Sequence, residues 1–245
     1  METIDYETRL ISFIDILGWT KAIKQMQFND LHKVIKKVQD RCDAYSERRR
    51  NELEKLEGFR INPMFFQVKF SMFSDAMAIS MPIDFDARIC NTTAELIREF
   101  IIQGFLLRGG ITEGSLYHNN QTIFGSAIVE AHNLESEHAK YSRVLVDRSI
   151  VDVMKKSDPT SIIKDHLGEY VVDPFPILAS GLTADVLCQM YELDKLVGVM
   201  EANLKSTVDL NALQKWEYMA KLTHKSLSKF GDLTEKTVHH LEELI

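Results

Sequence analysis

One short apolar run with a single aspartate inside it constrains the fold of this chain more than any other feature. Leu10–Leu17 has the sequence LISFIDIL and is ended by Gly18. An apolar run of this length is typical of a strand buried on both faces of a sheet. An unpaired carboxylate inside such a strand would be costly, so Asp15 needs a compensating partner, and a metal ion is one candidate. The alternative is that Asp15 lies at the strand's end and caps the turn at Gly18–Thr20.

A β-hairpin is predicted where a second aspartate occurs. Gln67–Phe73 and Ala76–Met81 are short β-like stretches separated only by Ser74 and Asp75, which predicts a hairpin with these two residues at its turn. Aspartate is a common turn residue, so Asp75 alone indicates structure rather than chemistry. The pair is more informative, because the end of the first strand and the hairpin turn can be neighbours in a βαββ unit. Two carboxylates there would suit two Mn²⁺ or Mg²⁺ ions, with triphosphate oxygens as further ligands.

The remaining apolar spacings predict a mixed fold with a helical tail. They indicate helices over Asn29–Glu57, Phe85–Leu106, Ala127–Glu137 and Ser149–Met154, a hairpin of Arg108–Tyr117 with Gln121–Phe124, and strands over Arg143–Val146 and Tyr170–Val172. The order βαββαββαβ predicts an α/β (α+β) domain over residues 1–176, with an antiparallel-containing central sheet. Leu182–Phe230 has helical spacing and no strand signal, which predicts a C-terminal helical extension over residues 177–245.

The charge of the chain argues against several kinds of partner. Its formal net charge is -7, whereas nucleic acids and anionic membranes require a basic face. We therefore expect no nucleic-acid partner and no membrane partner. The three cysteines are too widely spaced for a zinc site or a redox dithiol, no apolar run is long enough to span a bilayer, and the acidic N-terminus does not resemble a signal peptide. These features predict a cytoplasmic protein with reduced thiols.

Four short motifs follow one another between Leu10 and Val172. Phe13–Thr20 matches Phe-x-Asp-Ile-x-Gly-Phe-Thr, and Asp75 lies in a hairpin with the sequence FSDAMAIS. Arg108–Gly114 matches Arg-x-Gly-Ile-x-x-Gly, and Phe124–Ser136 matches Phe-Gly-x-x-x-x-x-Ala-x-x-Leu-Glu-Ser. In kind and in order, these motifs resemble those of the class III adenylate and guanylate cyclase family.

The resemblance implies a cyclase-like sandwich fold and a nucleoside triphosphate site at a homodimer interface. It implies that Asp15 and Asp75 are the catalytic carboxylates and that they, with Ile16, bind two Mn²⁺ or Mg²⁺ ions. The substrate-binding residues would be Phe13, Leu17, Gly18, Trp19, Ser71, Arg108 and Thr122.

Four positions depart from the purine-specific members of that family. Ser71 stands where those enzymes carry Lys or Glu, and Thr122 where they carry Asp or Cys. Val129 and Asn133 occupy the places of the Asn and Arg that stabilise the transition state, so a partner cannot supply the usual guanidinium from there. Asn133 and Arg143 are then the candidates for a contribution from the dimer partner.

Three short segments of this chain resemble those of the pyrimidine cyclases of bacterial Pycsar antiphage defence: Ile-Leu-Gly at 16–18, Phe-Ser-Asp at 73–75 and Arg-Gly-Gly-Ile at 108–111. The resemblance implies conversion of UTP, or less readily CTP, to the 3',5'-cyclic mononucleotide and pyrophosphate, with the product activating a separate effector. The short hydroxyl side chains of Ser71 and Thr122 would fit a uracil or cytosine edge. The alternative is a catalytically degenerate cyclase-like module that binds a nucleotide or only dimerises.

Two further groups of residues have a structural and a functional interpretation. Arg108 and Arg143 could reach triphosphate oxygens, although an arginine that begins a strand commonly forms a surface ion pair. A group of acidic and histidine side chains on one predicted helix resembles a metal-binding cluster, although a solvent-exposed helix face explains the group more simply. Its members are Glu130, His132, Glu135, Glu137 and His138.

Overall fold

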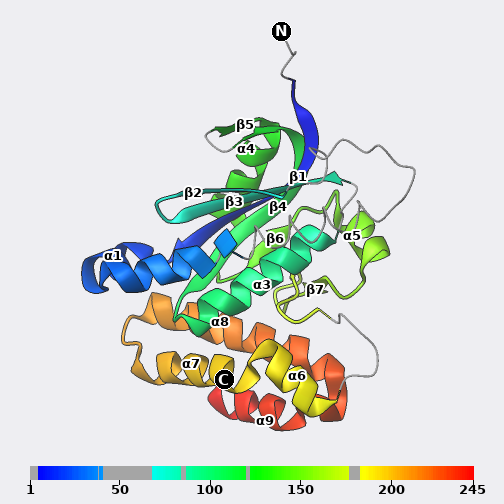
Figure 1. The fold of residues 1–245 in the computed structure, drawn as a ribbon. Helices are drawn as coiled ribbons and strands as arrows, with labels where there is room; N and C mark the ends of the chain where they lie inside the picture. The colour runs from blue at the N-terminus through cyan, green and yellow to red at the C-terminus, as the bar shows by residue number, and fades with distance from the viewer. Residues whose placement is uncertain (1–4, 38, 41–67, 84–86, 120–121, 177–182) are drawn as a thin grey trace.

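A mostly antiparallel sheet, to which the described residues contribute eight strands, forms the centre of the computed structural model (Figure 1). The structure describes residues 5–37, 39–40, 68–83, 87–119, 122–176 and 183–245. The strands are β1 (Glu7–Leu17), β2 (Lys69–Phe73), β3 (Ala76–Pro82), β4 (Leu106–His118), β5 (Ile123–Phe124), β6 (Val144–Val146), β7 (Ile162–Lys164) and β8 (Tyr170–Val172). Their order is β2-β3-β1-β4-β6-β8-β7, and β5 pairs with β4. Among the described strands, β4 and β6 form the parallel pair and the other pairings are antiparallel.

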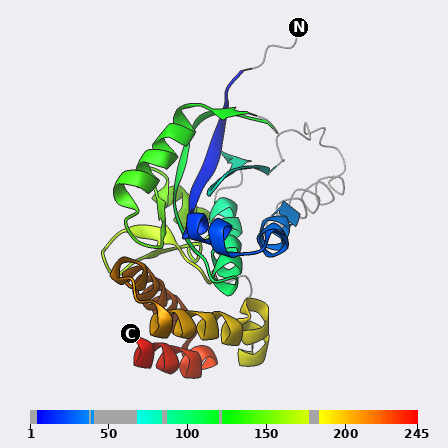
Figure 2. The ribbon, with the colours of Figure 1, turned by 90° about the vertical axis from the view of Figure 1, so that its left-hand side faces the viewer.

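Helices cover both faces of this sheet. They are α1 (Trp19–Gln25), a helical segment over 28–37, α3 (Arg88–Ile102), α4 (Ser126–Asn133), its π-helical continuation η3 (Leu134–His138) and α5 (Val151–Ser157). Figure 2 shows α4 and α3 on opposite sides of β1. Side chains of β1 alternate accordingly: Ile14 and Ile16 join the core that contains α3, whereas Ile11 packs with Ala127 and Ala131 of α4. This alternation places Asp15 on the α4 side of the sheet.

The predicted fold class is confirmed. The sheet contains the predicted first strand, which starts earlier at Glu7, and both predicted hairpins. The helix predicted over Phe85–Leu106 is α3. The helix predicted over Asn29–Glu57 is helical over 28–37 and 39–40, and its remaining part lies outside the described residues.

Two elements were not predicted from the sequence. Helix α1 follows β1 at once, because Gly18 has a positive φ of 84° that turns the chain within one residue. Strand β7 has three residues, too few for an alternating pattern to appear. It pairs with β8 at the edge of the sheet.

The C-terminal residues form the predicted helical tail, which packs below the sheet in Figure 1. Its elements are α6 (Ala184–Tyr191), α7 (Leu193–Ser206), α8 (Leu210–Leu227), the 3-10 segment η4 (Ser228–Thr234) and α9 (Glu235–Leu244). Helix α9 lies beyond the predicted end of the helical spacing at Phe230. Helix α7 packs against α3, and one continuous apolar core includes Phe100, Leu196 and Met219. The sheet and the helical tail therefore share one apolar core.

A buried ion pair joins the sheet domain to the tail. Arg143 Nη1 lies 2.6 Å from Asp165 Oδ2, and these side chains are 7% and 0% exposed. The hydroxyl of Tyr218 on α8 donates to the same carboxylate oxygen at 2.5 Å. Arg143 also donates to the carbonyl oxygen of His138 at 3.1 Å. The tail is thereby connected through Arg143 to the end of η3.

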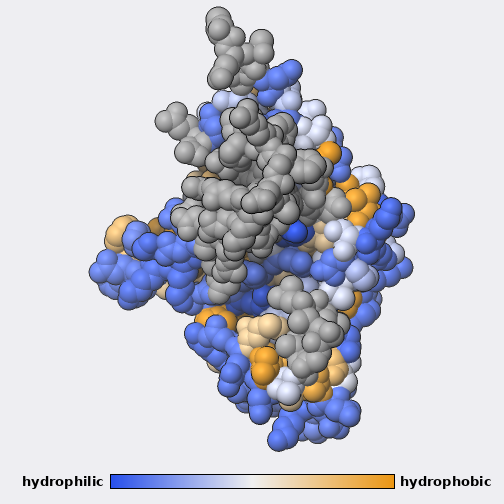
Figure 3. Space-filling view, turned by 45° about the vertical axis from the view of Figure 1, so that its right-hand side comes forward, coloured by the Kyte–Doolittle hydropathy of each residue, from blue (hydrophilic) through white to orange (hydrophobic). Residues whose placement is uncertain are grey.

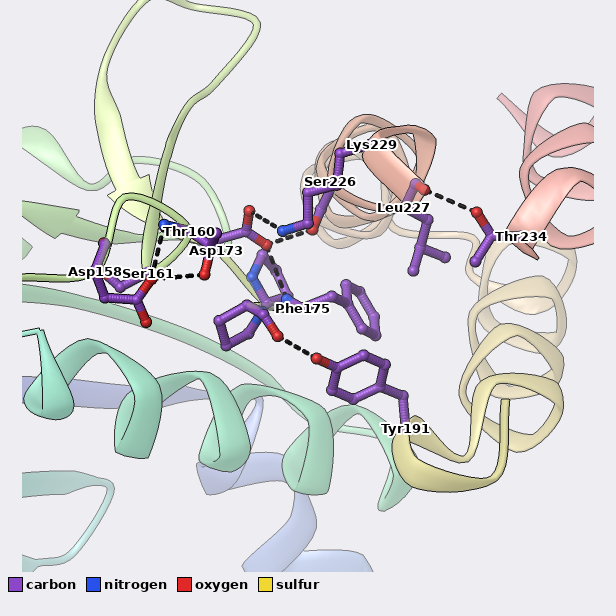
Figure 4. A network of polar contacts seen from close by, with 12 residues as sticks. Asp158, Thr160, Ser161, Asp173, Phe175, Tyr191, Ser226, Leu227, Lys229 and Thr234 are labelled. Carbon is purple, nitrogen blue, oxygen red and sulfur yellow. Dashed lines mark hydrogen bonds and ion pairs between the residues drawn. The ribbon is translucent and has the colours of Figure 1, made fainter. Parts of the chain in front are cut away.

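A second polar network joins the segment after β8 to α8 and η4 (Figure 4). The carboxylate of Asp173 accepts hydrogen bonds from the hydroxyl of Ser226, from Lys229 Nζ at 2.6 Å and from the backbone N–H of Phe175 at 2.9 Å. The hydroxyl of Tyr191 donates to the carbonyl oxygen of Pro176. Because Asp173 is only 2% exposed, these bonds compensate the burial of its charge.

The part of the surface that is coloured in Figure 3 is largely hydrophilic, with apolar residues in small separate patches. None of the helices in the described part of the chain combines the length and the apolar character that crossing a bilayer requires.

Gly110 fixes how closely the α4–η3 segment lies on the sheet. A Cβ atom at this position would lie 2.7 Å from the carbonyl oxygen of Ala131 and 2.9 Å from Leu134 Cβ. Backbone cannot retract from such a contact as a flexible side chain can, so a larger residue must displace the helix.

Gly110→Ala is therefore expected to destabilise the protein by roughly 1 to 3 kcal/mol, measured by urea denaturation. The matched control is Gly198→Ala on α7, where a Cβ has no atom within 4 Å and where alanine should be neutral or stabilise by up to about 1 kcal/mol. Unchanged stability of Gly110→Ala would show that the α4–η3 segment does not lie this close to Gly110.

Candidate active site

The end of β1 and the β2–β3 turn meet at one end of the sheet. Asp15 is opposite Ala76 on β3 and Arg108 on β4. The backbone N–H of Ile16 donates to the carbonyl oxygen of Asp75 at 2.8 Å. The structure thus brings together the backbone segments that carry the two predicted carboxylates.

The partner that compensates Asp15 is an arginine on the neighbouring strand. Arg108 Nη2 lies 2.8 Å from Asp15 Oδ2, and Arg108 Nε lies 2.6 Å from Glu135 Oε1. The side chains of Asp15 and Arg108 are 21% and 27% exposed, whereas that of Glu135 is 5% exposed. Burial raises the pKa of Glu135, and the Asp15 charge adds to this, while Arg108 and His132 oppose it. One guanidinium is therefore shared between a buried and a partly exposed carboxylate.

Glu135 is a site residue that the sequence analysis missed. We expected a solvated helix face, and four members of that group, Glu130, His132, Glu137 and His138, are exposed. Glu135 instead continues the buried stripe of Ala127 and Ala131, each four residues apart, and so faces the sheet. That spacing was a signal in the sequence that could have identified it.

Three of the predicted substrate-binding residues form the β1–α1 turn. Leu17 ends β1, Gly18 turns the chain, and Trp19 begins α1. The Trp19 side chain is buried against Phe105, with ring centroids 5.6 Å apart, so its backbone is the part that can face a ligand. Phe13 lies two residues before Asp15 and packs edge-on against His132 at 5.3 Å.

The predicted base-contacting positions lie further along the same face. Ser71 on β2 is opposite Ala78, which is opposite Phe13 on β1. Its hydroxyl lies 2.8 Å from His118 Nε2, a contact that the sequence did not reveal. Thr122 is exposed immediately before β5, next to the residue that pairs with His118.

The two candidates for a dimer contribution lie in different surroundings. Asn133 and Val129 are both exposed on α4, and their spacing of four residues puts them on one helix face. Arg143 is 6% exposed and holds Asp165 within its own chain. This burial corrects the expectation that Arg143 reaches a partner or a triphosphate: its guanidinium binds Asp165, the carboxylate to which Tyr218 of the tail also donates.

The donor set at the end of the sheet fits a nucleotide-bound divalent cation. Asp15 and Asp75 would supply carboxylate oxygens to such a cation, and Mg²⁺ sites of this kind usually combine one or two carboxylates with phosphate oxygens and water. Within the residues that the structure describes, no group of three or more His, Cys, Asp or Glu side chains is arranged to hold a metal by itself. The negative charges of Asp15, Asp75 and Glu135 would also attract a cation.

No protein-family model and no curated protein matches this chain. Solved structures similar to it are cyclase domains. The monomeric guanylyl cyclase domain of the RhoGC fusion protein from Blastocladiella emersonii is 17% identical, with 70% of this chain and 98% of that chain covered and a TM-score of 0.48. The GTP complex of the guanylate cyclase domain of RhGC from Catenaria anguillulae is 16% identical, with coverages of 69% and 98% and a TM-score of 0.47.

The adenylyl cyclase CyaB from P. aeruginosa is 13% identical, with 70% of this chain and 96% of that chain covered and a TM-score of 0.44.

Proposed function

We propose that this chain is a metal-dependent nucleotide cyclase of the class III type. It converts UTP, or less readily CTP, to the 3',5'-cyclic mononucleotide and pyrophosphate, and the product serves as a second messenger for a separate effector in antiphage defence. The observation that carries the proposal is the meeting of Asp15 and the Asp75 turn at one end of the sheet, beside Arg108. These residues occupy the motif positions at which the family binds metal and triphosphate.

In the reaction, the 3'-hydroxyl oxygen bonds to the α-phosphorus, the bond from that phosphorus to the β-bridging oxygen breaks, and the hydroxyl proton leaves with the solvent. Two Mn²⁺ or Mg²⁺ ions, when bound, would neutralise the charge that develops on the phosphates. Asp15 and Asp75 would hold these ions with Ile16. Arg108 keeps the Asp15 carboxylate in place through the 2.8 Å ion pair, while the β1–α1 turn faces the triphosphate.

A second protomer completes this proposed site. The exposed face of α4, with Val129 and Asn133, is the surface that a partner would bring to the nucleotide. The active species is therefore proposed to be a homodimer in which each nucleotide lies between two chains.

A second candidate function is a catalytically degenerate module that binds a nucleotide without converting it. The observation that favours it is the burial of Arg143 together with the identity of Val129 and Asn133. None of these three positions offers a guanidinium to a transition state.

Incubation of the purified protein with each of the four nucleoside triphosphates and Mn²⁺ separates these functions. We expect UTP to be turned over at least about tenfold faster than ATP or GTP, because a purine at a pyrimidine site leaves polar groups unpaired. Mass spectrometry identifies the product, and pyrophosphate release gives the rate. Specific activity should fall on dilution if the dimer is the active species. ATP or GTP as the best substrate would contradict the pyrimidine assignment, and binding without any product would establish the degenerate module.

A further inference from the structure

A buried histidine connects three strands at the proposed base-binding end of the site. His118, at the end of β4, is 2% exposed. Its Nε2 atom lies 2.8 Å from the Ser71 hydroxyl on β2, and its Nδ1 atom lies 2.8 Å from the Ser80 hydroxyl on β3. Both ring nitrogens therefore have hydroxyl partners, and one of these partners is the residue proposed to contact the base.

The imidazole of His118 is neutral at neutral pH. Burial lowers the pKa of His118 to about 4, and the positive charges of Arg9 and Lys69 contribute to this. A neutral imidazole has one N–H donor and one acceptor nitrogen. Two arrangements are then possible, and they give the Ser71 hydroxyl opposite roles. The hydrogen-bond network around Ser80 decides between them.

Ser80 is fully buried and already accepts a hydrogen bond from a cation. Arg9 Nε donates to its hydroxyl oxygen at 3.0 Å, and Arg9 Nη2 donates to its carbonyl oxygen at 3.2 Å. The hydroxyl proton of Ser80 needs an acceptor of its own, and within the described part of the chain His118 Nδ1 is the acceptor in contact. A proton on Nδ1 would leave that buried donor unpaired. The nearby guanidinium also polarises the Ser80 hydroxyl and makes it a better donor.

The proton of the imidazole is consequently on Nε2, and it is donated to the oxygen of Ser71. The Ser71 proton is then free to be donated elsewhere. Ser71 is only partly buried and lies on the Asp15 face of the sheet, two strand spacings, or about 10 Å, from Phe13. The Ser71 hydroxyl can thus donate a hydrogen bond to a ligand on that face.

We propose that Ser80 and His118 together fix Ser71 as a hydrogen-bond donor, which makes the site select a base that presents a carbonyl group there. This inference rests on the proposed function and names its substrate. Uracil has a carbonyl oxygen at C4, which accepts from Ser71, whereas cytosine has an amino group, which would place two donors against each other. His118 and Ser80 are positioning residues that do not touch the nucleotide.

The tautomer can be measured without any nucleotide. The two nitrogens of a neutral imidazole have well-separated ¹⁵N shifts, so a long-range ¹H–¹⁵N spectrum of the labelled protein identifies the protonated one. The signals of His118 are assigned by their loss in His118→Gln. We expect the proton on Nε2, and a proton on Nδ1 would overturn the inference.

Ser80→Ala tests the consequence for specificity. Without the Ser80 proton both tautomers become accessible, so the preference for UTP over CTP in kcat/KM should fall by about tenfold. The matched control is Ser12→Ala, which removes another fully buried serine of this sheet, one bonded to Thr93 on the opposite face. An unchanged preference in Ser80→Ala, or an equal change in Ser12→Ala, would contradict the role of His118.

Failure of the proposed function is distinguishable from failure of this inference. Calorimetric titration with UTP and CTP measures the same preference as a ratio of binding constants. UTP that binds more tightly than CTP but is not turned over would overturn the cyclase activity and support the selection by Ser71. Turnover of UTP with equal binding of UTP and CTP would support the cyclase activity and overturn the selection by Ser71. The spectrum of the unmodified protein decides the tautomer even if Ser80→Ala does not fold.

Discussion

Asp15→Asn is expected to lower turnover of UTP at least about 100-fold while the protein remains folded. Asparagine keeps the volume of the side chain but loses the charge that would hold a divalent cation. The fold should survive because Arg108 retains Glu135 at 2.6 Å, so the guanidinium keeps a carboxylate partner. Asp75→Asn should have a comparable effect on turnover, because its carboxylate is the second proposed metal ligand.

The matched control for these variants is Asp152→Asn, which removes an exposed carboxylate from α5. Pyrophosphate release measures turnover, and urea denaturation shows that each variant is folded. Activity of Asp15→Asn within a few fold of the unmodified protein would reject the metal-binding assignment.

Arg143→Met is expected to have the largest effect on stability, a loss of about 3 to 5 kcal/mol. The substitution removes the guanidinium that lies 2.6 Å from Asp165 and leaves a carboxylate that is 0% exposed. Replacing both partners, as Arg143→Met with Asp165→Leu, should recover part of this loss, because it leaves no unpaired buried charge.

An exposed pair provides the control for this prediction. Arg148 and Glu169 are 3.3 Å apart with side chains 80% and 40% exposed, so Arg148→Met should cost less than about 1 kcal/mol. Urea denaturation of the three variants measures the differences. Equal stabilities of Arg143→Met and Arg148→Met would mean that the buried pair does not hold the tail.

The same pair makes stability sensitive to acid. Burial alone would raise the pKa of Asp165, but hydrogen bonds from Tyr218, from the backbone of Glu169 and from Arg143 outweigh it and hold the pKa below its usual value. A carboxylate with a depressed folded-state pKa contributes stability above its unfolded pKa of about 3.9 and loses it as pH falls through the folded value. The cost of Arg143→Met should therefore shrink below about pH 4.

Local patterns were sufficient to predict the elements that carry the candidate site. An apolar run with one aspartate predicted β1, and Ser74 with Asp75 predicted the turn between β2 and β3, because both signals lie within a few consecutive residues. The residues that surround these aspartates are far away in the sequence. Arg108 is separated from Asp15 by 93 residues, and the register of β1 with β4 decides their contact.

Two errors of interpretation have physical explanations. Arg143 begins a strand, a position typical of a surface pair, but Asp165 on the loop between β7 and β8 and Tyr218 on α8 bury it. The first strand of the second hairpin was predicted to end at Tyr117, whereas β4 extends to His118. Its partners Ser71 and Ser80 lie 47 and 38 residues away, so no local pattern could identify the network.

A crystal structure with Mn²⁺ and 3'-deoxy-UTP, which lacks the attacking hydroxyl, tests the central claim most directly. Anomalous scattering distinguishes manganese from water and from lighter ions. We predict manganese between the carboxylates of Asp15 and Asp75, with the triphosphate against the β1–α1 turn and the C4 carbonyl of uracil accepting from Ser71. Manganese bound elsewhere, or a nucleotide that does not contact this end of the sheet, would contradict the assignment of the site.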